Sequence, residues 1–170
     1  MLIRFDPGLL VSCTVCIFSA GIVVNALPLW RPNVKASLVY RVAAVLLLLF
    51  SVGHTLGFRQ SDPAWGADAL LGSMRSIHFD VQGFDRTYWD LFLAAGFSVG
   101  VFYLFSAILA WQLGGLPPET LARLRGVAWA FALCFAAITV VSWRYLFIVP
   151  IVFSLVITVS LISAAWLSSK

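Results

Sequence analysis

Two histidines are the residues of this chain best suited to proton transfer or to ligand binding. His54 stands in the apolar run Gly53-His54-Thr55-Leu56-Gly57, and His78 lies in a polar segment further along. Imidazole titrates near neutral pH, so it can exchange a proton or hydrogen-bond a ligand. Haem would need two axial ligands set well inside the membrane, and His78 does not meet that need. We therefore expect no cofactor.

Asp90 is the second group of interest, because it starts a long apolar run directly after Asp85, Arg86 and Tyr88. His54 lies near the end of the preceding apolar run, so two consecutive membrane spans would bring both groups to a similar depth. A hydrogen bond between imidazole and carboxylate would offset the cost of a charge at that depth. The alternative is that His54 bonds a backbone carbonyl while Asp90 caps its own helix.

Basic and aromatic side chains are expected at the same membrane face as this pair. The candidate ligand-binding residues are therefore His54, Asp90, Arg59, Arg86, Arg144, Tyr88 and His78. A polar pocket of this kind at one membrane face would suit the head group of a small lipophilic molecule, such as a quinone or an isoprenoid lipid. No phosphate-binding glycine loop or HExxH motif is present, so the sequence does not decide whether the protein is an enzyme.

Cys13 and Cys16 form a CxxC motif inside the first apolar run. Membrane thiol oxidoreductases that reduce quinones need a second cysteine pair to pass electrons on, and only Cys134 is left. Metal binding would require further soft ligands nearby, and the run contains none. We expect no metal site, and we interpret these cysteines as small apolar packing residues.

The composition excludes a soluble domain. Hydrophobic residues make up 62% of the 170 residues and charged residues only 11%, against about 45–50% and about 25% in soluble domains. The net charge of +4 comes from basic residues scattered at the ends of apolar runs. That distribution is typical of anchoring at lipid headgroups, and it argues against nucleic-acid binding.

Five charge-free runs predict an all-α, polytopic membrane helix bundle. We expect five transmembrane helices near 9–30, 38–58, 89–112, 122–143 and 146–167, forming a single membrane domain over residues 1–170. The alternative is four helices plus a cleaved signal peptide. The retained anchor is favoured because the first run is longer than the apolar core of a signal peptide.

The segment 59–87 is the one long connection, at 29 residues, and most connections are far shorter. It is rich in apolar side chains, which a disordered linker would lack. Asp62 and Pro63 are typical of the N-cap and first position of a helix. We therefore expect a short interfacial helix near 63–75, lying on the membrane surface.

Two GxxxG motifs predict close helix packing, one at Gly53 and Gly57 and the other at Gly96 and Gly100. Small residues at this spacing allow two helix backbones to approach closely. The contact could lie within the bundle, or between protomers in a homo- or hetero-oligomer. This leaves open a second function class, a non-catalytic accessory or assembly subunit of a membrane complex.

From residue 41 to 170 the chain resembles a loose group of small bacterial inner-membrane proteins to which no reaction is assigned. The resemblance rests on Gly-His-Thr-Leu-Gly-Phe at 53–58, on Met74 and Gly83 in the long connection, on Arg86-Thr87 and Asp90-Leu91, on Phe105-Ser106-Ala107, and on Tyr145 and Pro150. It implies a bacterial inner-membrane location and a bundle of four spans. The first span here would then be an addition. The resemblance implies no mechanism.

Overall fold

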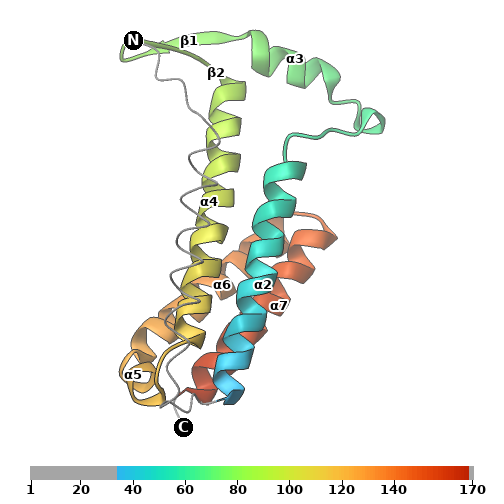
Figure 1. Cartoon of the computed structure of the whole chain (residues 1–170). Coiled ribbons are helices and arrows are strands. Elements are labelled where there is room, and N and C mark those ends of the chain that lie inside the picture. The colour runs from blue at the N-terminus through green and yellow to red at the C-terminus, as the bar shows by residue number, and fades with distance from the viewer. Residues whose placement is uncertain (1–33, 169–170) are drawn as a thin grey trace. The chain divides into compact units, whose positions relative to one another are not determined.

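The structure is a computed structural model, and it describes residues 34–168 of the 170-residue chain. The expected first span at 9–30, with Cys13 and Cys16, lies outside the described residues. The elements run in the order α2 (Val34–Gly57), η2 (Pro63–Trp65), α3 (Asp68–Ser76), β1 (His78–Val81), β2 (Phe84–Thr87), α4 (Tyr88–Gly114), α5 (Pro118–Arg123), α6 (Arg125–Tyr145) and α7 (Ile148–Leu167) (Figure 1).

Four of these helices are long and apolar enough to cross a membrane. They are Lys35–Gly57, Tyr88–Gly114, Arg125–Tyr145 and Ile148–Leu167, with mean hydropathies of 2.0, 2.1, 1.9 and 2.5. The shortest has 20 residues, which at about 1.5 Å per residue covers the roughly 30 Å of a hydrocarbon core. Large apolar side chains such as Leu49, Val101, Val140 and Leu155 are exposed on these helices, as lipid-facing residues are. The described residues therefore form a mostly helical, multi-pass membrane bundle.

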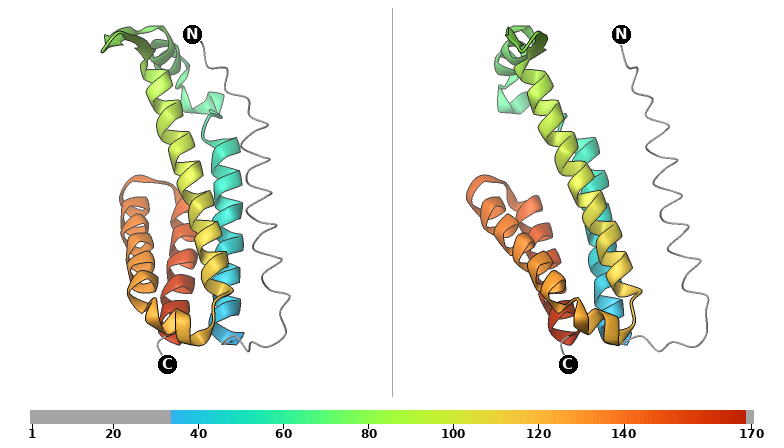
Figure 2. Two further views of the ribbon diagram at one scale, coloured as in Figure 1. Left: turned by 60° about the vertical axis from the view of Figure 1, so that its left-hand side comes forward. Right: turned by 90° about the vertical axis from the view of Figure 1, so that its left-hand side faces the viewer.

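The chain forms two compact units, whose described residues are 34–43 with 108–168, and 44–107. In the first unit α6 and α7 form an antiparallel hairpin (Figure 2). The Thr139 hydroxyl donates to the carbonyl of Phe135, and its oxygen lies 2.9 Å from the Thr158 hydroxyl of α7. Pro150 lies in the first turn of α7, where a missing N–H costs least.

In the second unit the segment 59–87, which we call the cap, joins the end of α2 to the start of α4. It contains more regular structure than the sequence indicates. The helix of the cap begins at Asp68 rather than near residue 63, and only a 3-10 turn occupies Pro63–Trp65. The Asp62 carboxylate does cap that turn, because it accepts a hydrogen bond from the Ala64 amide.

The second half of the cap is a β-hairpin, which the sequence pattern does not predict. Strands β1 and β2 pair antiparallel, with His78 opposite Thr87 and Val81 opposite Phe84. Gln82 and Gly83 form the two-residue turn with φ of 57° and 83°, and positive φ at both positions is what a type I′ hairpin turn requires.

Candidate functional site

His54 lies in the contact between α2 and α4. Its Nε2 is 3.0 Å from the carbonyl oxygen of Gly96, so the proton on that nitrogen is donated to the carbonyl. The ring stacks with Phe50 of α2 at a centroid distance of 6.0 Å and with Phe58, the residue after α2, at 5.3 Å. His54 is therefore half-buried in an aromatic environment near the end of a membrane span.

The two GxxxG motifs have different surroundings. A Cβ on Gly96 would overlap the Phe58 ring, and one on Gly100 would lie 2.5 Å from Thr55 Oγ1. Gly100 also accepts a 2.8 Å hydrogen bond on its carbonyl from the buried Ser51 hydroxyl. A Cβ on Gly53 or Gly57, by contrast, would meet no atom of the described residues within 4 Å. The motif on α4 thus lets α2 approach, while the motif on α2 contacts no other part of residues 34–168.

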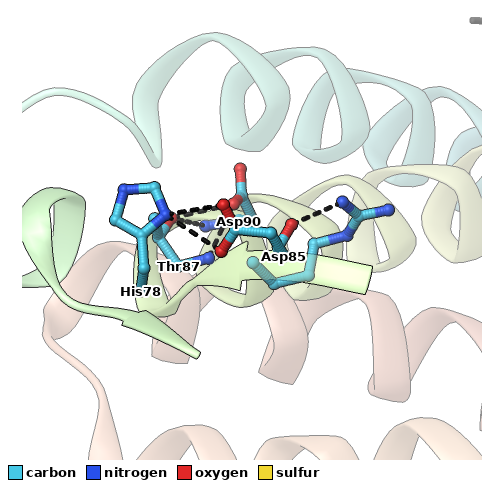
Figure 3. A network of polar contacts seen from close by, with 5 residues as sticks. His78, Asp85, Thr87 and Asp90 are labelled. Carbon is cyan, nitrogen blue, oxygen red and sulfur yellow. Dashed lines mark hydrogen bonds and ion pairs between the residues drawn. The ribbon is translucent and has the colours of Figure 1, made fainter. Parts of the chain in front are cut away.

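Asp90 forms a capping box with Thr87 at the start of α4 (Figure 3). The Asp90 carboxylate accepts hydrogen bonds from the Thr87 amide and hydroxyl, both at 2.8 Å. The Thr87 hydroxyl oxygen in turn accepts from the Asp90 amide at 3.2 Å. These reciprocal bonds satisfy N–H groups that the first turn of a helix leaves without partners. His54 and Asp90 therefore have different partners, as in the alternative that the sequence left open.

The side chains of His78 and Asp85 pair on the polar face of the hairpin, and the pair is ionic only when the imidazole is protonated. The His78 Nδ1 lies 3.0 Å and 3.1 Å from the two carboxylate oxygens of Asp85 (Figure 3). Both side chains are mostly exposed, so the pair contributes little to stability. The Arg86 guanidinium lies on the other side of the strand, over the Phe84 ring at 5.3 Å, and donates to the Asp85 carbonyl.

Aromatic and cation–π contacts hold the cap against the first turn of α4. The Arg75 guanidinium of α3 lies 4.4 Å from the centre of the Trp89 ring, and Phe79 of β1 packs on Tyr88 at 5.0 Å. Cation–π contacts at this distance contribute about 0.5–1 kcal/mol each at exposed sites. The cap is therefore held to α4 by its α-helix and by its hairpin.

The remaining basic candidates are dispersed. The Arg59 guanidinium lies over the Phe97 ring at 5.5 Å, on the same unit as His54. Arg144 belongs to the other unit, where it lies over the Tyr145 ring at 5.6 Å. The structure thus brings His78, Asp85, Thr87 and Asp90 together at the hairpin and places His54 among aromatic rings. A single cluster of all the candidates stays a prediction.

Sequence reasoning missed Thr87 and Ser51. Thr87 could have been found from the spacing Thr-x-x-Asp before an apolar run, which is a variant of the capping-box pattern. Ser51 gives no such signal, because a serine within an apolar run is equally compatible with a bond to its own helix.

A comparison of the chain with protein-family models, curated proteins and solved structures finds no match. The class of the protein therefore rests on its own fold, which is that of a multi-pass helical membrane protein. Within residues 34–168 no three side chains of the metal-binding types gather in one place.

Proposed function

We propose that the protein is a bacterial inner-membrane protein that binds a small lipophilic molecule with a hydroxyl head group beside His54. The observation that carries the proposal is the hydrogen bond from His54 Nε2 to the Gly96 carbonyl. With its proton on Nε2, a neutral imidazole presents Nδ1 as an acceptor. A hydroxyl is the head group that such an acceptor binds.

The surroundings of His54 fit the apolar part of such a ligand. Phe50 and Phe58 stack on the imidazole, and Phe92 and Phe97 pack around Phe58 at 5.7 Å and 5.2 Å. Aromatic walls with a few polar groups are typical of small-molecule sites. A quinol ring or an isoprenoid alcohol combines a flat or flexible apolar body with a hydroxyl. The bacterial origin in this proposal is what the sequence resemblance implies. The proposal also includes the first of the five expected membrane spans.

His54→Ala is expected to weaken ligand binding about tenfold, which is the effect of losing one hydrogen bond at a partly buried site. The purified protein would be titrated with decylubiquinol and, separately, with farnesol, and binding followed by tryptophan fluorescence in detergent. His78→Ala is the matched control, because His78 is exposed on the hairpin. The two probes distinguish a quinol from an isoprenoid alcohol. Wild-type affinity in His54→Ala, or an equal loss in His78→Ala, would contradict the proposal.

A second function, that of an accessory or assembly subunit, is supported by the open motif on α2. Among the described residues, no atom lies within 4 Å of the position that a Cβ on Gly53 or Gly57 would take, whereas Phe58 and Thr55 lie against Gly96 and Gly100. A partner helix from a second copy or from another protein would fit against the open glycines.

A further inference from the structure

Arg41 is the one charged side chain between Lys35 and the end of α2. It follows Lys35 by six residues along the span Lys35–Gly57, which places it about 9 Å deeper along the helix axis. Ionisable residues inside membrane spans are costly and usually serve a function. We therefore expect Arg41 to have a partner that balances its charge.

The surroundings of Arg41 are a close contact between α2 and the end of α4. A Cβ on Gly114 would lie 3.2 Å from Tyr40 Cβ and 3.4 Å from Arg41 Cγ, and the Ser37 hydroxyl donates to the Gly114 carbonyl. The Arg41 guanidinium lies 5.2 Å from the centre of the Trp111 ring. Tyr40 and Arg41 thus flank the same glycine, and the guanidinium is held against an aromatic surface.

Two hydrogen-bond donors in this contact have no acceptor among the described residues. The Nε of Arg41 and the hydroxyl of Tyr40 are both buried without a hydrogen-bond partner in residues 34–168, and Tyr40 as a whole is 0% exposed. The Ser168 hydroxyl interacts with the Tyr40 hydroxyl, but the contact falls short of hydrogen-bond distance and angle limits, and Ser168 itself donates to the Ala164 carbonyl. Buried polar groups are nearly always hydrogen-bonded, so two neighbouring exceptions indicate a missing acceptor.

The described part of this unit supplies no negative charge for Arg41. Its basic residues are Lys35, Arg41, Arg123, Arg125 and Arg144, and its one acidic side chain is Glu119, which is exposed. The ion pair of the described residues, His78 with Asp85, lies in the other unit. An acceptor that is also anionic would meet both needs, since a guanidinium binds oxyanions through several N–H groups.

We propose that Arg41 and Tyr40 form a binding site for a phosphate group at the end of the membrane span. The Arg41 guanidinium holds the charge of the phosphate, and the Tyr40 hydroxyl donates a further hydrogen bond to it. An arginine at this depth reaches the headgroup level, where phosphate is abundant. The same chemistry could come from the headgroup of a phospholipid or from a free phosphate ion.

The test compares lipid and ion on the intact protein in detergent. Native mass spectrometry would count bound dioleoyl phosphatidylglycerol, and thermal unfolding would be measured with that lipid or with inorganic phosphate. We expect Arg41→Gln and Tyr40→Phe each to weaken binding about tenfold. Arg125→Gln is the matched control, because Arg125 is an exposed arginine of the same unit. Stabilisation by phosphatidylglycerol alone would identify a headgroup, and equal stabilisation by phosphate would identify the ion.

Tyr40→Phe is the decisive variant, because it removes only a hydroxyl and keeps the buried ring and the Cβ that lies beside Gly114. Without ligand, its melting temperature should equal or exceed that of the wild type, since an unpaired buried donor is removed. With phosphatidylglycerol or phosphate present, the melting temperature of Tyr40→Phe should rise less than that of the wild type. Loss of binding in Arg41→Gln alone would overturn the shared site, because it is what non-specific attraction of an arginine to headgroups produces. Equal binding in all four proteins would also overturn it.

Discussion

Gly96→Leu is expected to destabilise the protein by about 3 kcal/mol, the upper end of what overpacking costs. A Cβ at this position would overlap the Phe58 ring. That ring has little room to move, because it packs on His54, Phe92 and Phe97 at 5.3, 5.7 and 5.2 Å. Separating α2 from α4 would also break the bond from His54 to the Gly96 carbonyl. The measurement is the thermal or detergent-induced unfolding of purified protein.

Gly53→Leu is the matched control for Gly96→Leu. A Cβ on Gly53 would meet no atom of residues 34–168 within 4 Å, and leucine is a better helix former than glycine. The free energy of unfolding of Gly53→Leu should therefore stay within about 0.5 kcal/mol of the wild-type value. Equal destabilisation by the two leucines would show that the two GxxxG motifs are not packed differently.

Phe135→Ala is expected to destabilise the hairpin of α6 and α7 by about 2–3 kcal/mol. Phe135 is 0% exposed and packs edge-to-face against Phe131 at 5.4 Å. In a membrane the apolar transfer term is small, so the cost is mainly the cavity and the lost van der Waals contacts. Leu133→Ala is the control on the same helix, because Leu133 is 64% exposed. A similar fall in stability for both variants would contradict the burial that the structure assigns to Phe135.

The helices could be predicted from the sequence because membrane spans depend on length and apolarity alone. The four expected spans that fall within the described residues correspond to α2, α4, α6 and α7. The observed bounds of the helices differ from the expected ones where local sequence features set the first residue of a helix. The fourth expected span starts near residue 122, whereas Pro118 starts the short helix α5 and the spanning helix α6 begins only at Arg125.

The β-hairpin of the cap could not be predicted by the same route. Each strand has four residues and contains aspartate, which is a poor strand former. The turn places Gln82, a residue with a side chain, at positive φ. The Asp80 carboxylate stabilises this turn by accepting from the Gly83 amide at 3.0 Å, a local bond that no hydrophobic pattern indicates.

The candidate site illustrates what spacing can and cannot determine. The sequence indicated that His54 and Asp90 are candidate site residues, and both side chains make specific hydrogen bonds. It could not determine their partners, because a helix can be rotated about its axis without changing the depth of any residue. That rotation decides whether His54 meets a carboxylate or the carbonyl of Gly96. The same rotation decides which of two identical GxxxG motifs is packed.

The most direct test of the multi-pass account is the sidedness of α4. Single cysteines would be introduced at Asp68 in the cap and at Gly115 just after α4, in a background from which Cys13, Cys16 and Cys134 have been removed. A membrane-impermeant maleimide would then be applied to intact cells and to opened membranes. Because the 27 residues of α4 extend over about 40 Å, we expect the two positions to label from opposite sides of the membrane. Labelling of both from the same side would contradict the account.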